Sequence, residues 1–192
     1  MIKTNQKIYL ASNSPRRRKL LKQIGLSFKS FSVNSVEDFL DGEHPVKCVQ
    51  RIALEKMELA KLKVNDGIII TADTIVVLNK IVIGKPKSKS EAINVLSMLS
   101  GKTHTVYTGF CVYNQKTKKR ILDYEKTKVE FRDLNKDEII DYVEGGSPMD
   151  KAGAYGIQDD FGAVFVEKIN GCYYNVVGLP LTKLYSVLRR VI

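Results

Sequence analysis

Two pairs of strand-like runs in this chain are joined by connections too short for a parallel crossover. The apolar, β-branched run 67–78 is followed by a turn-like Asn79-Lys80 and by a second run at 81–83. The runs 103–113 and 121–131 are joined by a short polar connection in the same way. Parallel neighbours need a crossover of a dozen or more residues, so the sequence predicts that each pair is an antiparallel hairpin.

Helical patterns alternate with these hairpins. Pro15 and Pro45 each open an amphipathic run, and proline is favoured at the first helical position. Ser88 and Asn135 each precede a glutamate by three residues, which is the signature of a capping box. A further apolar helical face follows Pro180. The alternation of helices with hairpins predicts an α/β fold of the mixed α+β kind, with a mixed sheet.

The C-terminal third begins with a glycine-rich loop at 145–158. We expect two strands after it, joined at Asn170-Gly171, because that dipeptide favours a type I′ turn. The length of 192 residues suits one domain spanning 1–192. Apolar runs are far too short to span a membrane, and we find no signal peptide. The sequence therefore predicts a cytoplasmic protein without a membrane partner.

The cysteines and the net charge narrow the class of protein. Cys48, Cys111 and Cys172 are widely separated and show no metal-binding spacing, so we expect buried free thiols. A formal net charge of +10 favours an anionic partner, which could be a nucleic acid or a polyphosphate. The sign of the charge does not choose between them.

A strand-like stretch at 7–11 runs into Ser12-Asn13-Ser14-Pro15-Arg16-Arg17 at the start of a helix. Free backbone N–H groups and the helix dipole favour an anion there, and Ser14 is the expected N-cap. Cations in a first turn oppose the dipole by about 0.3–1 kcal/mol each. Arg16 and Arg17 therefore suggest a bound phosphate, although a basic solvated face on Arg17, Arg18 and Lys19 is the alternative.

A carboxylate interrupts the apolar run 67–78 at Asp73. An isolated charge buried in a strand is costly, so Asp73 needs a cation or a proton. It could be a structural ion-pair partner or a residue at a bend. It could instead be a metal ligand or the general base that activates water.

Two lysines are candidates for phosphate contacts. Lys56 lies three residues after Ala53 and four after Ile52, on or beside the buried face of its helix. Lys85, in Gly84-Lys85-Pro86, directly follows a strand. Lys56 could only bury its stem, and the segment of Lys85 could be a plain turn.

Several classes of enzyme are disfavoured. The two histidines, His44 and His104, have no matched nucleophile, so a covalent hydrolase is not indicated. The glycine-rich loop lacks the P-loop order, and no GxGxxG sequence opens a helix after a strand. These absences argue against kinases, GTPases and dinucleotide-binding enzymes.

Taken together, these motifs are similar to those of a known family. They are the segments 10–17 and 148–158, together with Leu20-Leu21, Ala72-Asp73-Thr74, Gly84-Lys85-Pro86 and Leu99-Ser100-Gly101. Over nearly its whole length the chain resembles the Maf family of nucleotide pyrophosphatases, which are related in fold to the inosine triphosphatases. Asp159-Asp160-Phe161-Gly162 departs from the shorter glycine-rich continuation of the family.

The resemblance implies a mixed sheet flanked by helices, with two lobes around a substrate cleft. It implies hydrolysis of a nucleoside triphosphate to its monophosphate and pyrophosphate with a divalent cation, Mg²⁺ or Mn²⁺, as in nucleotide-pool sanitation. Asp73 falls on the family's proton acceptor, and Glu37 resembles a second carboxylate that holds the metal with Asp73. The polar and basic cleft positions fall on Ser12, Arg16, Arg17, Lys56 and Lys85.

Within the family, the chain resembles the branch that acts on dTTP and UTP, at selectivity positions carried by Arg16, Thr74 and Gln158. The rival hypothesis is a non-catalytic regulator of septum formation that binds nucleotide or nucleic acid. We find no recognised nucleic-acid-binding motif, which disfavours nucleic acid as a partner. A homodimer is an expectation by analogy with the family alone.

Overall fold

The structure is a computed structural model that describes residues 2–158 and 161–192. Asp159 and Asp160, at the predicted departure from the family pattern, lie outside the described residues. The chain divides into two compact units, and each is described by itself. Unit 1 comprises Met1–Asp73, Thr108–Glu125 and Gly178–Ile192, and unit 2 comprises Thr74–Tyr107 and Lys126–Val177. The expectation of one domain over 1–192 stays a prediction.

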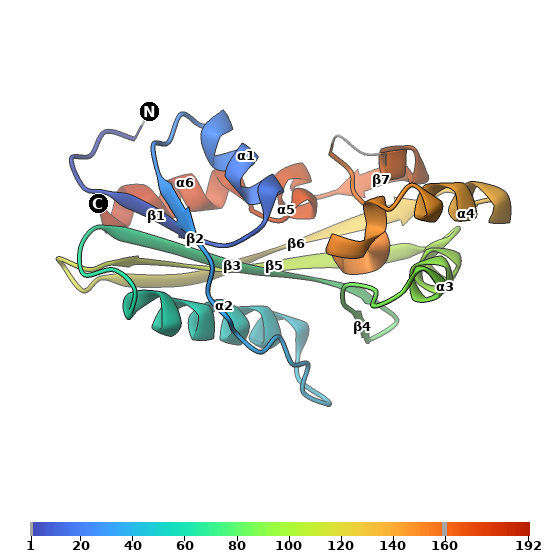
Figure 1. The fold of residues 1–192 in the computed structure, drawn as a ribbon, viewed down its shortest axis with the longest axis horizontal. Coiled ribbons are helices and arrows are strands. Elements are labelled where there is room, and N and C mark those ends of the chain that lie inside the picture. Colours follow the sequence, from blue (N-terminus) through green and yellow to red (C-terminus); the bar gives the residue numbers. More distant parts are fainter. Residues whose placement is uncertain (1, 159–160) are drawn as a thin grey trace. The chain divides into compact units, whose positions relative to one another are not determined.

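The described residues form a seven-stranded sheet with the order β2-β1-β3-β5-β6-β7, in which β4 pairs with β3 (Figure 1). β1 is parallel to β2 and to β3, whereas β4 is antiparallel to β3 and β7 to β6. The predicted mixed α/β fold is therefore confirmed. The strands are β1 (Ile8–Ala11), β2 (Lys29–Phe31), β3 (Ile68–Leu78), β4 (Ile81–Ile83), β5 (Thr103–Asn114), β6 (Arg120–Phe131) and β7 (Val166–Asn170).

The helix starts predicted from caps and prolines are confirmed. Ser14 caps the first helix by accepting from the Arg17 N–H, and Ser88 caps another by accepting from Glu91. Asn135 and Glu138 form a complete capping box. The helices are α1 (Pro15–Gln23), α2 (Pro45–Lys61), α3 (Lys89–Leu99), α4 (Lys136–Glu144), α5 (Tyr173–Val177) and α6 (Leu181–Val191), with 3-10 turns at Ser147–Asp150, Ala152–Ala154 and Phe161–Phe165.

In unit 1, α2 covers one face of the strands, and α1 and α6 lie on the opposite face (Figure 1). Met57 and Ala60 of α2 pack on Ile69 and Cys111 of the sheet in an apolar cluster. At Gly109 of β5 an added Cβ would lie 2.3 Å from the Val49 carbonyl oxygen. Glycine there allows α2 to approach the sheet closely.

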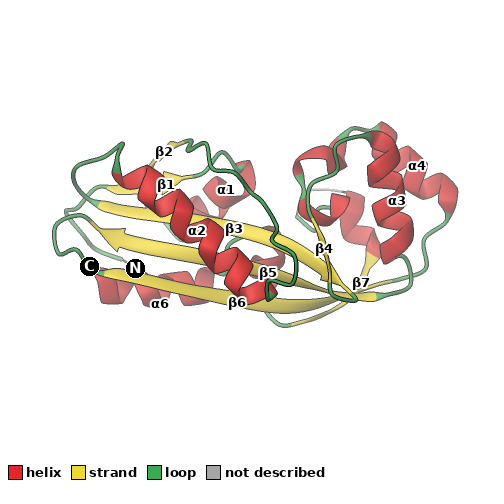
Figure 2. Cartoon of the chain, turned by 90° about the horizontal axis from the view of Figure 1, so that it is seen from below, coloured by secondary structure: helices red, strands yellow, loops and turns green. Residues whose placement is uncertain are grey.

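Unit 2 contains α3 and α4, which pack against each other (Figure 2). Its core includes Phe131, Tyr155 and Phe165. The ring of His104 makes edge contacts with Phe131 and Tyr155, and its Nε2 lies 2.8 Å from the Tyr155 hydroxyl. His104 is therefore a core residue of this unit.

The prediction of a second strand after Asn170-Gly171 is wrong. Helix α5 follows instead, because polar contacts from elsewhere hold the chain after the turn. Thr127 Oγ1 accepts from the Cys172 N–H and donates to the Cys172 carbonyl. The buried Asn175 amide donates to the Val106 carbonyl and to Thr127 Oγ1. These contacts lie in tertiary structure and leave no trace in the local pattern.

The three thiols are free, and Cys48 and Cys111 are buried as predicted. Cys172 is half-exposed, so the prediction of burial is wrong for that residue, which lies in the turn before α5. Among the helices of the described residues, none has the length and apolar character needed to cross a membrane.

Candidate functional site

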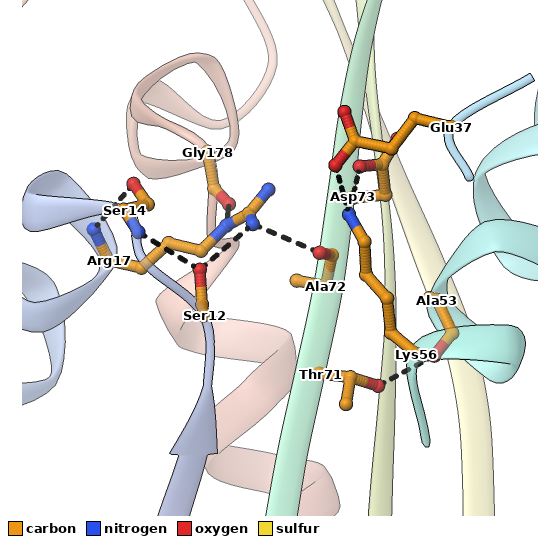
Figure 3. A network of polar contacts seen from close by, with 10 residues as sticks. All are labelled: Ser12, Ser14, Arg17, Glu37, Ala53, Lys56, Thr71, Ala72, Asp73 and Gly178. Carbon is orange, nitrogen blue, oxygen red and sulfur yellow. Dashed lines mark hydrogen bonds and ion pairs between the residues drawn. The ribbon is translucent and has the colours of Figure 1, made fainter. Parts of the chain in front are cut away.

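A buried ion pair joins α2 to β3 in unit 1. The Lys56 ammonium donates to Asp73 Oδ1 at 2.6 Å (Figure 3). Each of these two residues is only 6% exposed. Burying either charge alone would be strongly unfavourable, so each provides the counter-charge that the other needs. The sequence required a cation or a proton for Asp73, and the structure shows a cation, the Lys56 ammonium. Lys56, predicted on or beside the buried face of its helix, is buried.

The position of Lys56 follows from how α2 packs. Met57 and Ala60 lie on the neighbouring face of the helix and pack in the apolar cluster with the sheet. The hydroxyl of Thr71 donates to the Ala53 carbonyl at 2.7 Å (Figure 3). Thr71 and Asp73 lie on the same face of β3, because alternate residues of a strand point to the same side. This bond therefore attaches α2 to β3 at a point about one helical turn before Lys56.

A second carboxylate completes this group. Lys56 Nζ also donates to Glu37 Oε1 at 2.7 Å, so one ammonium lies between two carboxylates (Figure 3). The Glu37 side chain is 39% exposed, and it comes from the irregular segment between β2 and α2. In this structure the two carboxylates share the Lys56 ammonium. The role of Glu37 and Asp73 as metal ligands stays a prediction.

The segment between β1 and α1 forms a second polar group in unit 1. Ser12 is buried, and its Oγ accepts from the Ser14 N–H at 3.2 Å. It also accepts from Arg17 Nη1 at 3.3 Å. The same Nη1 donates to the Ala72 carbonyl at 2.9 Å, and Arg17 Nε donates to the Gly178 carbonyl at 2.9 Å (Figure 3).

These contacts give Arg17 a structural role that its sequence position did not indicate. Burial lowers the pKa of the guanidinium, and the carboxylates of Asp73 and Glu37 act in the opposite direction. The group remains charged, because arginine is not deprotonated in proteins. The carbonyl oxygens of Ala72 and Gly178 thus explain the presence of the Arg17 cation at this helix start. A bound phosphate is not needed to explain it. Arg16, one position earlier, is half-buried.

The two polar groups meet on adjacent residues of one strand. Arg17 holds the carbonyl of Ala72, and Lys56 holds the carboxylate of Asp73. Figure 3 shows Arg17 approaching β3 from one side and Lys56 approaching it from the other. The sequence singled out both cations, and the structure shows that they hold two consecutive residues of β3.

The remaining predicted residues belong to unit 2. Thr74 is half-buried and Lys85 is exposed. The Gly84 carbonyl, just before Lys85, accepts from the Gly153 N–H at 3.1 Å. Gln158 is half-buried, and its Oε1 is buried without a hydrogen-bond partner among the described residues. Thr74, Lys85 and Gln158 all belong to unit 2. Their role in binding a substrate stays a prediction.

Sequence reasoning missed Arg51 on α2. Its guanidinium makes a two-bond contact with Glu43, at 2.9 and 2.7 Å. It also contacts Glu55 at 3.0 Å and the Asp38 carbonyl at 2.9 Å. The spacing of Arg51 and Glu55 is a readable helical pair. No local signal indicated the contact with Asp38.

The described residues contain no group of three or more His, Cys, Asp or Glu side chains that could hold a metal by themselves. Mg²⁺ is usually bound through one or two carboxylates together with substrate phosphates and water. Glu37 and Asp73, which already face a common cation, fit that donor set. A metal here would complete its coordination with substrate phosphates and water.

Comparisons with known proteins identify the family of the chain. The family model described as "Maf-like protein" matches residues 7–191. A protein of Thermoanaerobacter sp. (strain X514) named dTTP/UTP pyrophosphatase is 48% identical over 185 residues, which cover 96% of each chain. One of the same name from Aquifex aeolicus (strain VF5) is 45% identical, covering 96% of this chain and 95% of its own. Among solved structures, the Staphylococcus aureus Ham1 protein aligns with a TM-score of 0.44 and 15% identity, over 66% of this chain and 72% of that one.

Proposed function

The chain belongs to the family of Maf-like proteins, and from that premise we propose that it is a nucleoside triphosphate pyrophosphatase. Its substrates are dTTP and UTP, the nucleotides in the names of its relatives. Its products are the nucleoside monophosphate and pyrophosphate. The identity of nearly half the residues over almost the full length supports this proposal.

The observation that carries the proposal is the buried Asp73 carboxylate held by Lys56. A carboxylate can accept a proton from water when it lies within hydrogen-bonding distance of it. Lys56 occupies one of the two oxygens of Asp73, and the other oxygen has no role in that contact. Asp73 is therefore proposed as the general base.

The reaction needs one water molecule and breaks one anhydride bond. Water adds to phosphorus as its proton passes to Asp73, and the bond between the α and β phosphoryl groups breaks. The bridging oxygen departs with the bonding electron pair, so the products are the nucleoside monophosphate and pyrophosphate. Positive groups that offset the charge of the triphosphate favour this step. We assign that role to Lys56 and Arg16 in unit 1 and to Lys85 in unit 2, with Ser12 and Arg17 shaping the segment that meets the phosphates.

A divalent cation, Mg²⁺ or Mn²⁺, is part of the proposal, with Glu37 and Asp73 as its protein ligands. When bound, such a cation offsets phosphate charge and makes a coordinated water more acidic. Lys56 places a positive charge between the same two carboxylates. Glu37, the more exposed of the two, is the carboxylate that can turn toward an incoming ligand.

Selectivity for the base is assigned to Arg16, Thr74 and Gln158. A buried amide oxygen without a partner is unfavourable, and Gln158 Oε1 is such an atom among the described residues. Thymine and uracil share an N3–H donor that can supply the missing bond. This supports Gln158 as a contact to the base.

The test is pyrophosphate release by the purified chain with Mg²⁺ or Mn²⁺ from each common nucleoside triphosphate. Release from dTTP and UTP above the others is expected, and Asp73→Asn should abolish it. Asp66→Asn is the matched control, because Asp66 forms an exposed pair with Lys7 away from these residues. An inactive wild type or a fully active Asp73→Asn protein would contradict the proposal. Salt-sensitive binding to nucleic acid without turnover would favour the non-catalytic rival.

A further inference from the structure

The segment that carries Glu37 has little regular structure to hold it in place. Residues 32–44 contain no helix or strand, only a turn at Asp41-Gly42. Val36, Phe39 and Leu40 are exposed, so apolar burial, apart from that of Val33 at the start of the segment, contributes little to fixing it. Glu37 nevertheless meets Lys56 at 2.7 Å. Other contacts must define its position.

Arg51 supplies such contacts from the rigid helix α2. Its Nη2 donates both to the Asp38 carbonyl at 2.9 Å and to Glu43 Oε2 at 2.7 Å. Its Nε donates to Glu43 Oε1 at 2.9 Å. One guanidinium therefore grips the segment at two points five residues apart, and one of them is the residue next to Glu37.

This contact is stronger than an ordinary surface pair. Two parallel bonds between a guanidinium and a carboxylate fix the geometry as well as adding energy. The Glu43 side chain is only 13% exposed. The hydrogen bonds from Arg51 hold the pKa of Glu43 below its ordinary value, so the carboxylate stays charged at neutral pH.

We propose that Arg51 is a positioning residue that clamps the segment 38–43 to α2 and thereby sets Glu37 against Lys56 and Asp73. Its effect on turnover rests on the proposed function, whereas its effect on the segment does not. Lys56 lies on the same helix, five residues after Arg51. The segment therefore contacts α2 at two residues, Arg51 and Lys56. Because both belong to one rigid helix, they hold the Glu37 carboxylate in place beside that of Asp73.

A purely structural role of Arg51 within α2 is the alternative. The pair with Glu55 is of the i,i+4 type and lies inside the helix, so it stabilises α2 without touching the segment. Glu55→Gln is therefore the matched control. It removes one carboxylate partner of Arg51 and leaves both contacts to the segment intact.

The first test is a double-mutant cycle on kcat/KM for dTTP, with Arg51→Met, Glu37→Gln and the double variant. If Arg51 acts through Glu37, Arg51→Met should lower kcat/KM about tenfold in the wild type and leave it almost unchanged in the Glu37→Gln background. Glu43→Gln, which keeps the shape of the side chain, should show the same pattern to a smaller extent. Equal losses in both backgrounds would overturn the proposal.

The second test is independent of turnover. Hydrogen exchange over 36–43 should become faster in Arg51→Met by about tenfold or more, and stay unchanged in Glu55→Gln. A useful reporter is the Glu43 N–H, which donates to the Leu40 carbonyl at 3.1 Å. Unchanged exchange in Arg51→Met would overturn the clamp. An inactive wild type with faster exchange in this variant would instead overturn the proposed function and leave the clamp standing.

Discussion

The guanidinium of Arg17 donates a 2.9 Å hydrogen bond to the carbonyl of Ala72, the residue that precedes Asp73 in β3. Its Nε holds Gly178, at the start of the C-terminal part of unit 1. Arg17 thus joins three stretches of chain that lie far apart in the sequence. Arg17 therefore helps to hold the backbone next to the proposed general base.

Arg17→Ala should therefore destabilise the protein. The hydrogen bonds of the guanidinium to Ser12 Oγ and to the carbonyls of Ala72 and Gly178 are lost, so we expect a loss of about 2–4 kcal/mol in the free energy of unfolding. Arg18→Ala is the control, because no hydrogen bond of the Arg18 side chain appears among the described residues, and its loss should stay within about 0.5 kcal/mol. Urea unfolding measures both. Equal losses would show that Arg17 acts only as part of a basic surface.

The ion pair between Lys56 and Asp73 predicts an asymmetric pattern of stability. Lys56→Met leaves a buried carboxylate without its cation and should cost about 3–5 kcal/mol. Asp73→Asn should cost less, because Lys56 keeps Glu37 as a partner. The double variant Lys56→Met/Asp73→Asn should recover part of the loss of Lys56→Met, since neither charge then remains buried alone.

Urea unfolding at neutral pH measures the free energy of unfolding of the three variants and so tests this pattern. A stable Lys56→Met protein would mean that the Asp73 side chain does not depend on Lys56 as its counter-charge. A double variant as unstable as the sum of the single ones would mean that the two side chains do not interact.

Gly109→Ala should separate α2 from β5. The added methyl carbon would lie 2.3 Å from the Val49 carbonyl oxygen, and backbone cannot yield as a side-chain end can. We expect a destabilisation of about 1–3 kcal/mol. A fall in kcat/KM should accompany it, because α2 carries Lys56. Gly145→Ala is a suitable control, since its nearest neighbour there would be 3.4 Å away at a helix end.

His104 makes the protein sensitive to acid. Burial lowers the pKa of His104 to about 4, against an ordinary value of 6.5. The unfolded chain therefore binds more protons between these values, and the free energy of unfolding falls as pH drops from about 6.5 to about 4. Above this window the contribution is fully present. This difference between the two pKa values corresponds to a change of roughly 3 kcal/mol in the free energy of unfolding.

His104→Gln should flatten the dependence of stability on pH in that window, although it lowers stability at neutral pH by removing the Tyr155 contact. Urea midpoints at several pH values between about 4.5 and 7 give the slope. Glu43 and Glu138 have lowered pKa values, so their contributions are lost at more acidic pH. An unchanged slope in His104→Gln would show that His104 is not the group responsible.

Much of the fold could be predicted because local chemistry decides it. The serine caps at Ser14 and Ser88 and the capping box at Asn135 each fix a helix start within a few residues. Hairpins follow from connection lengths alone. The strand expected after Asn170-Gly171 failed for the opposite reason, since the contacts of Thr127 and Asn175 that hold α5 come from distant parts of the chain.

The candidate site likewise combines features that follow from the local sequence with contacts between distant parts of the chain. The sequence by itself determined that Asp73 lies in a buried strand and needs a cation or a proton, and that Lys56 lies on or beside the buried face of its helix, because the periodicity of apolar residues is a local property. Only the tertiary structure decided that these two meet, that Glu37 joins them and that Arg17 and Arg51 hold the surrounding backbone. Such contacts join residues far apart in the chain, and their geometry depends on how the helices pack on the sheet.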